Sequence, residues 1–317
     1  MLIPLLLAAA LVALTNGANA NFKGVASLYG SGTTPLRTAL WWGTAMTFVG
    51  SVTAMFLAQG MLRKFSGRGI VPDSLVESDS FLSAVAIGAA STSFLATRFG
   101  FPVSTTHALL GALLGAGLVG GGTEIGWSAL AGGLVVPLFF SPLIAVLLGV
   151  IVYRLLRSLH LAPDHRTPML DRLHFLSAGA ASFARGLNDT PKIAALLLLV
   201  PALDIRLGIL AVGIMIALGG LFDADRVAET LGKKVTDMNP GQGFAASLVT
   251  AGLVTTASWH SLPVSTTHVS VGSLIGIGLT TRQAKWRKVA EILLAWIGTA
   301  PCGAICAATA YRLLLMT

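Results

Sequence analysis

Ten apolar stretches separated by short polar segments constrain this chain more than any other feature of its sequence. They lie near 2–15, 39–62, 81–97, 103–121, 127–153, 175–200, 205–221, 241–260, 264–280 and 288–316. Only 11% of the 317 residues are charged and 54% are hydrophobic, whereas soluble domains carry about 25% charged residues. A helical bilayer crossing takes about 20 apolar residues. Backbone groups cannot be left open to lipid, and the stretches lack a two-residue alternation. The sequence therefore predicts an all-α integral membrane protein with about 10 to 12 membrane elements, not a barrel.

The net charge of +8 is a further feature. The basic residues are spread over short loops and form no patch with stacking aromatics, so nucleic acid is not an expected partner. The expected partner is the lipid bilayer of the cell's inner (plasma) membrane, which the chain crosses several times. The positive-inside rule places three basic loops in the cytoplasm, including a linker at 154–173, and puts both termini outside. The basic residues of the three loops are Arg154, Arg157, Arg166 and Arg172; Arg226, Lys233 and Lys234; and Arg282, Lys285, Arg287 and Lys288.

Two motifs occur twice in the chain. FPVSTTHALLG at 101–111 returns as LPVSTTHVSVG at 262–272, and NGANANFKGVA at 16–26 aligns with RGLNDTPKIAA at 185–195. Internal repeats of this kind indicate that one structural unit has been used twice. A signal peptide at the N-terminus is the alternative for the first apolar stretch. That stretch lacks a basic n-region and ends in a repeated motif, so we interpret it as a membrane element.

The repeat predicts how the two halves are oriented. We expect the first unit at 1–153 and the second at 174–317, joined by the linker 154–173. Five elements per half is an odd number, so the second half enters the membrane from the opposite side, as in the inverted-topology repeats of secondary transporters. The two hairpins at 81–121 and 241–280, re-entrant or built from broken helices, then meet at the membrane midplane.

The VSTTH strings have the pattern of helix N-termini. A proline followed by Ser and Thr favours a helix start, and such a start binds anions through free backbone NH groups and the helix dipole. The alternative is that these hydroxyls bond to carbonyls at a helix kink. His107 and His268 follow the tips and are candidates for relaying protons or for orienting the tips. The candidate substrate residues are Ser104, Thr105, Thr106, Ser265, Thr266 and Thr267.

Asp189 is an acidic residue in the middle of an apolar stretch. An intramembrane carboxylate indicates function, and Pro191 breaks the helix beside it, which frees carbonyls. With Asn188, these oxygens suit a small cation. The alternative is a core ion pair with Arg185 or Lys192. Importing a dianion against the membrane potential costs about 2.3 kcal/mol per charge per 100 mV, so a co-transported cation is expected.

Together the motifs NGANANFKGVASLYGSG, FPVSTTHALLGALLG, ARGLNDTPKIAALLL and LPVSTTHVSVGSLIG resemble the inorganic phosphate transporter (PiT) family. The resemblance covers nearly the whole chain, and the brief linker resembles compact bacterial members. It implies symport of inorganic phosphate with sodium or protons, a homodimer, and no cofactor besides the coupling ion. It also places Asn19 and Asn188 beside the six tip residues in the substrate site, and Asp189, Asn188 and Asn19 around the coupling cation.

The first half departs from the family pattern. It has Ala20 where the family has aspartate after the Gly-Ala-Asn of Gly17 to Asn19. Either one cation site is lost or weakened, or coupling rests on Asp189 alone, or the chain is an altered version of an active protein. The sequence leads us to expect that Ala20→Asp strengthens sodium dependence.

Other functions remain as alternatives. Sulfate has the shape of phosphate but carries no OH at neutral pH, so an unpaired acceptor such as Asp189 favours phosphate over a sulfate permease. A passive anion channel is a weaker alternative. An enzyme is not expected, because the histidine three residues after Ser104 or Ser265 is on the same helix turn and no orienting carboxylate is near.

Overall fold

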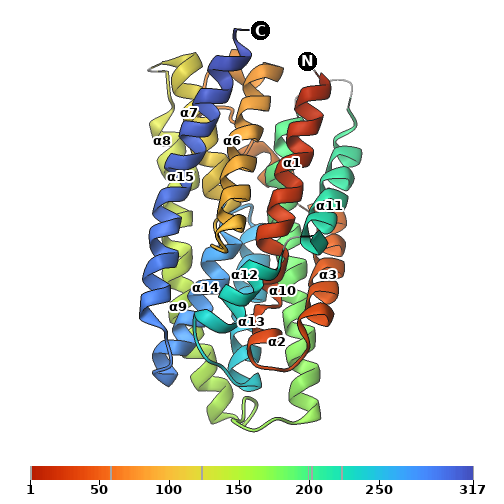
Figure 1. The fold of residues 1–317 in the computed structure, drawn as a ribbon, viewed down its shortest axis with the longest axis vertical. Helices are drawn as coiled ribbons and strands as arrows, with labels where there is room; N and C mark the ends of the chain where they lie inside the picture. The colour runs from red at the N-terminus through yellow and green to blue at the C-terminus, as the bar shows by residue number, and fades with distance from the viewer. Residues whose placement is uncertain are drawn as a thin grey trace.

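The protein is a bundle of long helices, as predicted (Figure 1). The computed structural model describes residues 2–57, 59–122, 124–198, 200, 203–222 and 224–316, and no strand is present among them. Ten of the described helices have 16 residues or more, and each overlaps one of the ten predicted apolar stretches. They are α1 (Leu2–Ala20), α3 (Leu36–Leu57), α6 (Asp79–Arg98), α7 (Thr105–Gly121), α9 (Val136–Ser158), α10 (Pro168–Ala194), α11 (Ile205–Phe222), α13 (Pro240–Trp259), α14 (Thr266–Thr281) and α15 (Trp286–Leu314).

Short helical segments connect the long ones. Several lie where a long helix ends, which lets the chain change direction without leaving backbone groups unpaired. They are η1 (Asn21–Gly24), α2 (Ala26–Gly30), α4 (Gln59–Lys64), α5 (Asp73–Val76), α8 (Trp127–Leu130), η2 (Ala131–Val135), η3 (Ala195–Leu197), α12 (Asp225–Glu229) and η4 (Thr230–Lys234).

Six of the described helical segments are long and apolar enough to cross a membrane. Two of the remaining long helices, α7 and α14, have only 17 and 16 residues, which is short for a full crossing. Helix α10 is long but contains several charged residues. The chain is thus a multi-pass membrane protein in which some long helices lack the length or the composition of a full crossing. The six segments are Leu2–Gly24, Leu36–Leu57, Asp79–Arg98, Trp127–Ser158, Ile205–Phe222 and Trp286–Leu314.

The two short hairpins lie in opposite halves of the bundle. Figure 1 shows α6 and α7 in the upper half and α13 and α14 in the lower half. Helices of the first half of the chain also pack against helices of the second half. Helix α7 packs against α15 and α14 packs against α9, while α1 packs against α11 and α10 against α3. Each half therefore completes the packing of the other, and α1 is an integral part of the bundle.

Two of the three basic loops, at 154–173 and 282–288, lie at the end of the bundle away from the chain termini, whereas α12, in the third, lies near mid-height (Figure 1). Lys285 Nζ donates to the carbonyl oxygen of Lys233 at 2.8 Å, and Asn239 Nδ2 donates to Asp164 Oδ1 at 3.2 Å. Helix α9 runs into the predicted linker from one side and α10 begins inside it, so the stretch between these two helices is 159–167.

Glycines allow the closest helix contacts. A Cβ added at Gly115 would overlap the carbonyl oxygen of Ala304 on α15, and one added at Gly276 would overlap that of Val146 on α9. Close backbone approach through small residues four apart is typical of membrane helix pairs. Gly111 and Gly115 on α7, and Gly272 and Gly276 on α14, are each four residues apart, and a Cβ at any of the four would lie under 3.0 Å from backbone of the neighbouring helix.

We expect Gly115→Ala to lower the free energy of unfolding by about 1–3 kcal/mol, because overpacking forces the α7–α15 pair apart. Gly298→Ala is the matched control, since nothing lies within 4 Å of a Cβ added at Gly298. There the change should be neutral or stabilising by about 0.5–1 kcal/mol, the helix preference of Ala over Gly. Thermal unfolding in detergent measures both, and equal melting temperatures for the two variants would contradict the packing argument.

Candidate functional site

Both VSTTH strings form helix N-termini. Helix α7 begins at Thr105 with Ser104 as its N-cap, and α14 begins at Thr266 with Ser265 as its N-cap. The Oγ atom of each serine accepts the backbone N–H of the histidine three residues later, at 3.2 Å in both tips. The serines cap the helices and do not bond to carbonyls at a kink. The predicted helix starts are therefore confirmed.

The two tips are in contact. Thr267 Oγ1, in the second tip, donates to the carbonyl oxygen of Val103 in the first tip at 2.8 Å. Trp296 of α15 braces the same loop, because its Nε1 donates to the carbonyl oxygen of Pro102 at 3.0 Å. The residues 161 apart in sequence are thus brought to one place, between the upper and lower hairpins.

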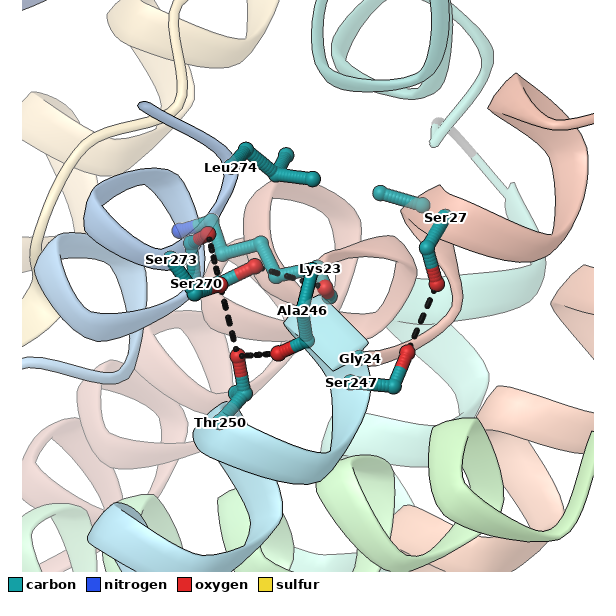
Figure 2. Close-up of a pocket in the computed structure, with 10 residues that line it drawn as sticks. Lys23, Gly24, Ser27, Ala246, Ser247, Thr250, Ser270, Ser273 and Leu274 are labelled. Carbon is teal, nitrogen blue, oxygen red and sulfur yellow. Dashed lines mark hydrogen bonds between the residues drawn. The ribbon is translucent and has the colours of Figure 1, made fainter. Parts of the chain in front are cut away.

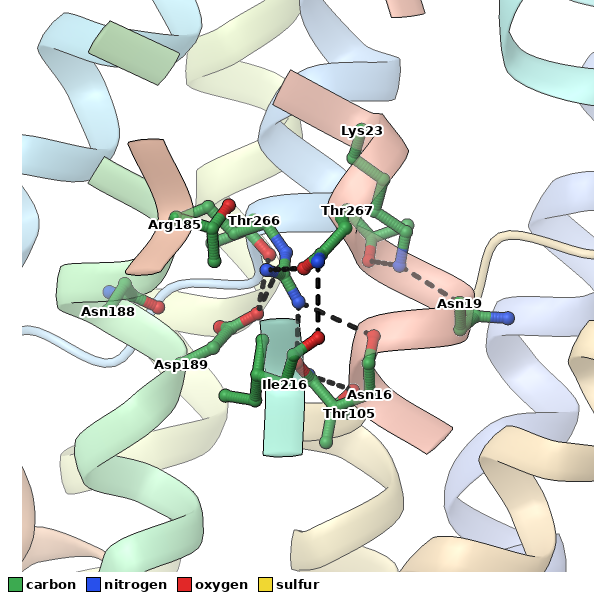
Figure 3. A network of polar contacts seen from close by, with 12 residues as sticks. Asn16, Asn19, Lys23, Thr105, Arg185, Asn188, Asp189, Ile216, Thr266 and Thr267 are labelled. Atoms are coloured by element: carbon green, nitrogen blue, oxygen red, sulfur yellow. Dashed lines mark hydrogen bonds and ion pairs between the residues drawn. The ribbon is translucent and has the colours of Figure 1, made fainter. Parts of the chain in front are cut away.

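Lys23 lies where the tips meet (Figure 3). Its Nζ donates to Asn19 Oδ1 at 3.0 Å, to the carbonyl oxygen of Val103 at 2.7 Å and to Thr267 Oγ1 at 2.6 Å. An ammonium has three donors and no acceptor, so all three hydrogens have a partner. The Asn19 side chain is held in turn, because Nδ2 donates to Thr97 Oγ1 at 3.0 Å.

Lys192 occupies the equivalent place in the second half. Its Nζ donates to the carbonyl oxygen of Val264 at 2.7 Å, to Thr106 Oγ1 at 2.9 Å and to Asn188 Oδ1. It also lies 3.3 Å from Asp189 Oδ1. Each lysine thus bonds the asparagine four residues earlier, a carbonyl of the tip in its own half, and a threonine of the tip in the other half.

Arg185 is a third buried cation, one turn before Asp189 on α10. Its Nη1 donates to Asn21 Oδ1 at 2.6 Å, and its Nη2 donates to Asn16 Oδ1. Asn16 Nδ2 then donates to Thr105 Oγ1 at 2.8 Å, which connects the arginine to the first tip. The guanidinium Nε is 3.7 Å from Asp189 Oδ2.

Asp189 is paired on both oxygens. Oδ1 faces the Lys192 ammonium, and Oδ2 accepts from Thr266 Oγ1 at 3.1 Å beside the Arg185 guanidinium. The ion pairs with Arg185 and Lys192, the alternative in the sequence analysis, are therefore present. The expectation that Asp189 is an unpaired acceptor is wrong, because these donors reach it from its own helix and from the second tip.

The two histidines lie next to each other behind the tips. Their ring centroids are 4.6 Å apart, and His268 stacks on Trp296 with centroids 3.9 Å apart. His107 Nδ1 is 2.9 Å from Ser104 Oγ. The bond to Ser104 supports the tip-orienting interpretation for His107, whereas the His268 ring nitrogens have no hydrogen-bond partner among the described residues.

Part of this network was not predicted from the sequence motifs. All the predicted tip, Asn and Asp residues lie in it or border it, but Lys23, Asn16 and Asn21 were not expected there, and Arg185 and Lys192 only as partners of Asp189. A signal for the lysines was available, because Lys23 aligns with Lys192 in the repeated motif and both lie within apolar chain. Buried lysines in such a setting are rare unless they are functional.

The network contains more positive than negative charge. Lys23, Arg185 and Lys192 are at most 3% exposed, and they share a single buried carboxylate, that of Asp189. The formal excess is two positive charges. Burying a charge without compensation is costly, so this place favours an anion, and a dianion would neutralise it.

Two small cavities adjoin the network. One, of about 10 Å³, borders Lys23 and is lined by hydroxyls of Ser27, Ser247, Thr250, Ser270 and Ser273 (Figure 2). The other, of about 20 Å³, borders Lys192 and is lined mainly by apolar side chains, among them Phe65, Leu109, Leu113 and Leu196. Each has room for about one water molecule and is too small for a tetrahedral oxyanion.

The fold and the site together define a class: a multi-pass helical membrane protein whose buried cationic site lies between two helix tips.

Comparison with known proteins gives the family of the chain. The family model described as "Phosphate transporter family" matches residues 16–168 and 160–307. A "Probable low-affinity inorganic phosphate transporter" of Rhizobium meliloti (strain 1021) is 31% identical, over 93% of this chain and 91% of its own length. One of Bacillus subtilis (strain 168) with the same description is 26% identical, over 88% and 87% of the two chains.

The chain therefore belongs to the phosphate transporter family. A solved structure described as "The sodium-dependent phosphate transporter" has the same fold, with a TM-score of 0.78, 24% identity and 99% of each chain covered. The family resemblance seen in the sequence is thus confirmed.

We expect Asp189→Asn to lower the free energy of unfolding by about 3–5 kcal/mol, because it leaves three buried cations without a carboxylate. Glu77→Gln is the control, since it makes the same chemical change in an exposed ion pair with Arg68, where such pairs contribute little. Thermal unfolding in detergent compares the two. A variant at Asp189 as stable as the control would show that the carboxylate does not compensate the cluster.

Proposed function

We propose that this protein imports inorganic phosphate across the plasma membrane by symport with a cation, sodium or a proton. The observation that carries the proposal is the buried formal excess of two positive charges where the tips of the two halves meet. Phosphate at neutral pH is a mixture of monoanion and dianion, and the dianion matches this excess. Membership of the phosphate transporter family and the descriptions of the two relatives support the same substrate.

We propose an inverted-topology repeat as the basis of transport. The identical order of long helices in both halves, the reciprocal packing, and the hairpins in opposite halves of the bundle support it. In this arrangement both termini are outside, the linker 154–173 is cytoplasmic, and two copies form a homodimer.

The tip contacts explain how the site could open. Thr106 and Thr267 each bond a lysine of the other half, so moving one hairpin away from the opposite half breaks these bonds. That movement frees ammonium and hydroxyl donors for an oxyanion while the bundle elsewhere stays packed. The proposed substrate residues are those of the sequence analysis: Asn19, Ser104, Thr105, Thr106, Asn188, Ser265, Thr266 and Thr267.

A symported cation is part of the proposal because of the membrane potential. A dianion enters a negative interior at a cost of about 2.3 kcal/mol per charge per 100 mV. Asp189, Asn188 and Asn19 supply the oxygens that the sequence analysis assigns to this cation.

Sulfate transport is the second candidate, and one observation favours it. Lysine, arginine and threonine donors surround the tips, and the Asp189 carboxylate already has partners. A site made of donors accepts sulfate as readily as phosphate.

Uptake into proteoliposomes tests these functions. We expect labelled phosphate to accumulate under an imposed cation gradient and uptake to stop when the gradient collapses, which a passive channel would not show. Sulfate accumulation in preference to phosphate would reverse the assignment of the substrate.

Thr267→Val tests the tip. It should lower the initial rate of phosphate uptake about tenfold, since a hydrogen bond to a charged group is worth about 1.5–3 kcal/mol. Thr309→Val is the matched control, because Thr309 is exposed on α15 and bonds only the carbonyl oxygen of Ile305. Equal rates in the two variants would remove Thr267 from the proposed site.

A further inference from the structure

The two buried lysines are surrounded by oxygen atoms from several parts of the chain. Around Lys23 Nζ lie an amide oxygen, a backbone carbonyl and a hydroxyl, from Asn19, Val103 and Thr267. Around Lys192 Nζ lie the same three kinds of oxygen, from Asn188, Val264 and Thr106, and in addition the Asp189 carboxylate. Amide, carbonyl, hydroxyl and carboxylate oxygens are also the ligands of hard metal cations.

The lysines leave no place for a second cation at these oxygens. Asn19 Oδ1 already accepts from Lys23 and from the backbone N–H of Val103 at 3.1 Å. Asn188 Oδ1 accepts from Lys192. A sodium ion bound there would also lie beside an ammonium of the same charge in a region where burial weakens dielectric screening. The residues present therefore do not fit a sodium ion while the lysines stay in place.

We propose that the ammonium groups of Lys23 and Lys192 are tethered cations that stand in the positions of metal ions beside the two Asn motifs. Phosphate uptake by this chain then requires no sodium. The inference rests on the proposed function and narrows the choice of coupling ion from sodium or a proton to the proton. It replaces the proposal that Asp189, Asn188 and Asn19 bind a sodium ion.

The coupling ion that remains is the proton. A tethered ammonium does not cross the membrane with the substrate, so a mobile cation is still needed to offset the membrane potential. A proton travels covalently bound to one oxygen or nitrogen atom and needs no shell of ligands. Accumulation of phosphate therefore follows a pH gradient imposed in the absence of sodium.

Ala20 fits this scheme. Lys192 has a carboxylate three residues before it, whereas Lys23 has the buried Ala20 in that position. The three donors of Lys23 are met by neutral oxygens, so its shell is complete without an aspartate. A carboxylate introduced by Ala20→Asp pairs with Lys23 and creates no sodium site, contrary to the expectation from the sequence.

The first experiment uses the wild-type protein in proteoliposomes at fixed pH and membrane potential, with sodium replaced by choline. The expected change in the initial rate of phosphate uptake is less than about twofold, because an ion without a site cannot shift the transport equilibrium. Sodium should also leave the thermal unfolding of the phosphate-free protein unchanged relative to choline. A strong stimulation or stabilisation of the wild type by sodium would overturn the inference.

The second experiment removes one ammonium group from the oxygen atoms that surround it. Lys192→Ala removes the ammonium and leaves its four oxygens around a space, so sodium should now bind there. We expect uptake in choline to fall about tenfold or more, as for the loss of one member of a buried charge pair, and to recover in sodium. Lys192→Met is the matched control, because its side chain removes the charge but fills the space, and sodium should not restore it.

Thermal unfolding separates this inference from the proposed function. Sodium should raise the melting temperature of Lys192→Ala and leave that of Lys192→Met unchanged, whatever the substrate. If Lys192→Ala does not fold, Lys23→Ala provides the same comparison at the other shell. Indifference of both alanine variants to sodium would overturn the tethered-cation inference. Failure of the wild type to take up phosphate under any gradient would instead overturn the proposed function.

Discussion

The rest of the structure depends on how two ammonium groups are kept inside a helical bundle. Both lysines are at most 3% exposed, so their N–H groups need oxygen partners from the protein itself. An unbroken helix has few carbonyls to offer, since its own turns use them. The extended residues before α7 and α14 leave the carbonyls of Val103 and Val264 free, and these accept from Lys23 and Lys192. The extended residues that precede α7 and α14 thus supply the carbonyl oxygens that stabilise the two buried lysines.

The bonds of the two lysines connect both halves of the chain, which explains why the halves form one unit. Each lysine bonds its own half through an asparagine and a carbonyl, and the other half through a threonine. The helix exchange around the site has the same pattern, with α7 against α15 and α14 against α9. Polar contacts at the centre and helix packing outside therefore both cross between the halves through different pairs of elements, so the tips have a defined position relative to both halves.

The parts of this arrangement that could be predicted are those fixed by neighbouring residues. Apolar stretches of bilayer length become helices because backbone groups have no other partner in lipid. Ser104 and Ser265 become N-caps because a proline and a hydroxyl act within one turn. What could not be predicted depends on distant partners. Lys23 and Thr267 are 244 residues apart. The partners of Asp189 include Thr266 of the second tip, 77 residues away, so the sequence alone cannot show whether this carboxylate is free to bind a cation.

The linings of the two small cavities differ, although they border equivalent lysines. Hydroxyls surround the one at Lys23, whereas leucines and Phe65 surround the one at Lys192. A constriction with an apolar lining resists wetting, while a hydroxyl lining supports a continuous file of water. A water molecule in the cavity beside Lys23 therefore finds several hydroxyl partners, whereas one in the cavity beside Lys192 meets mainly apolar side chains.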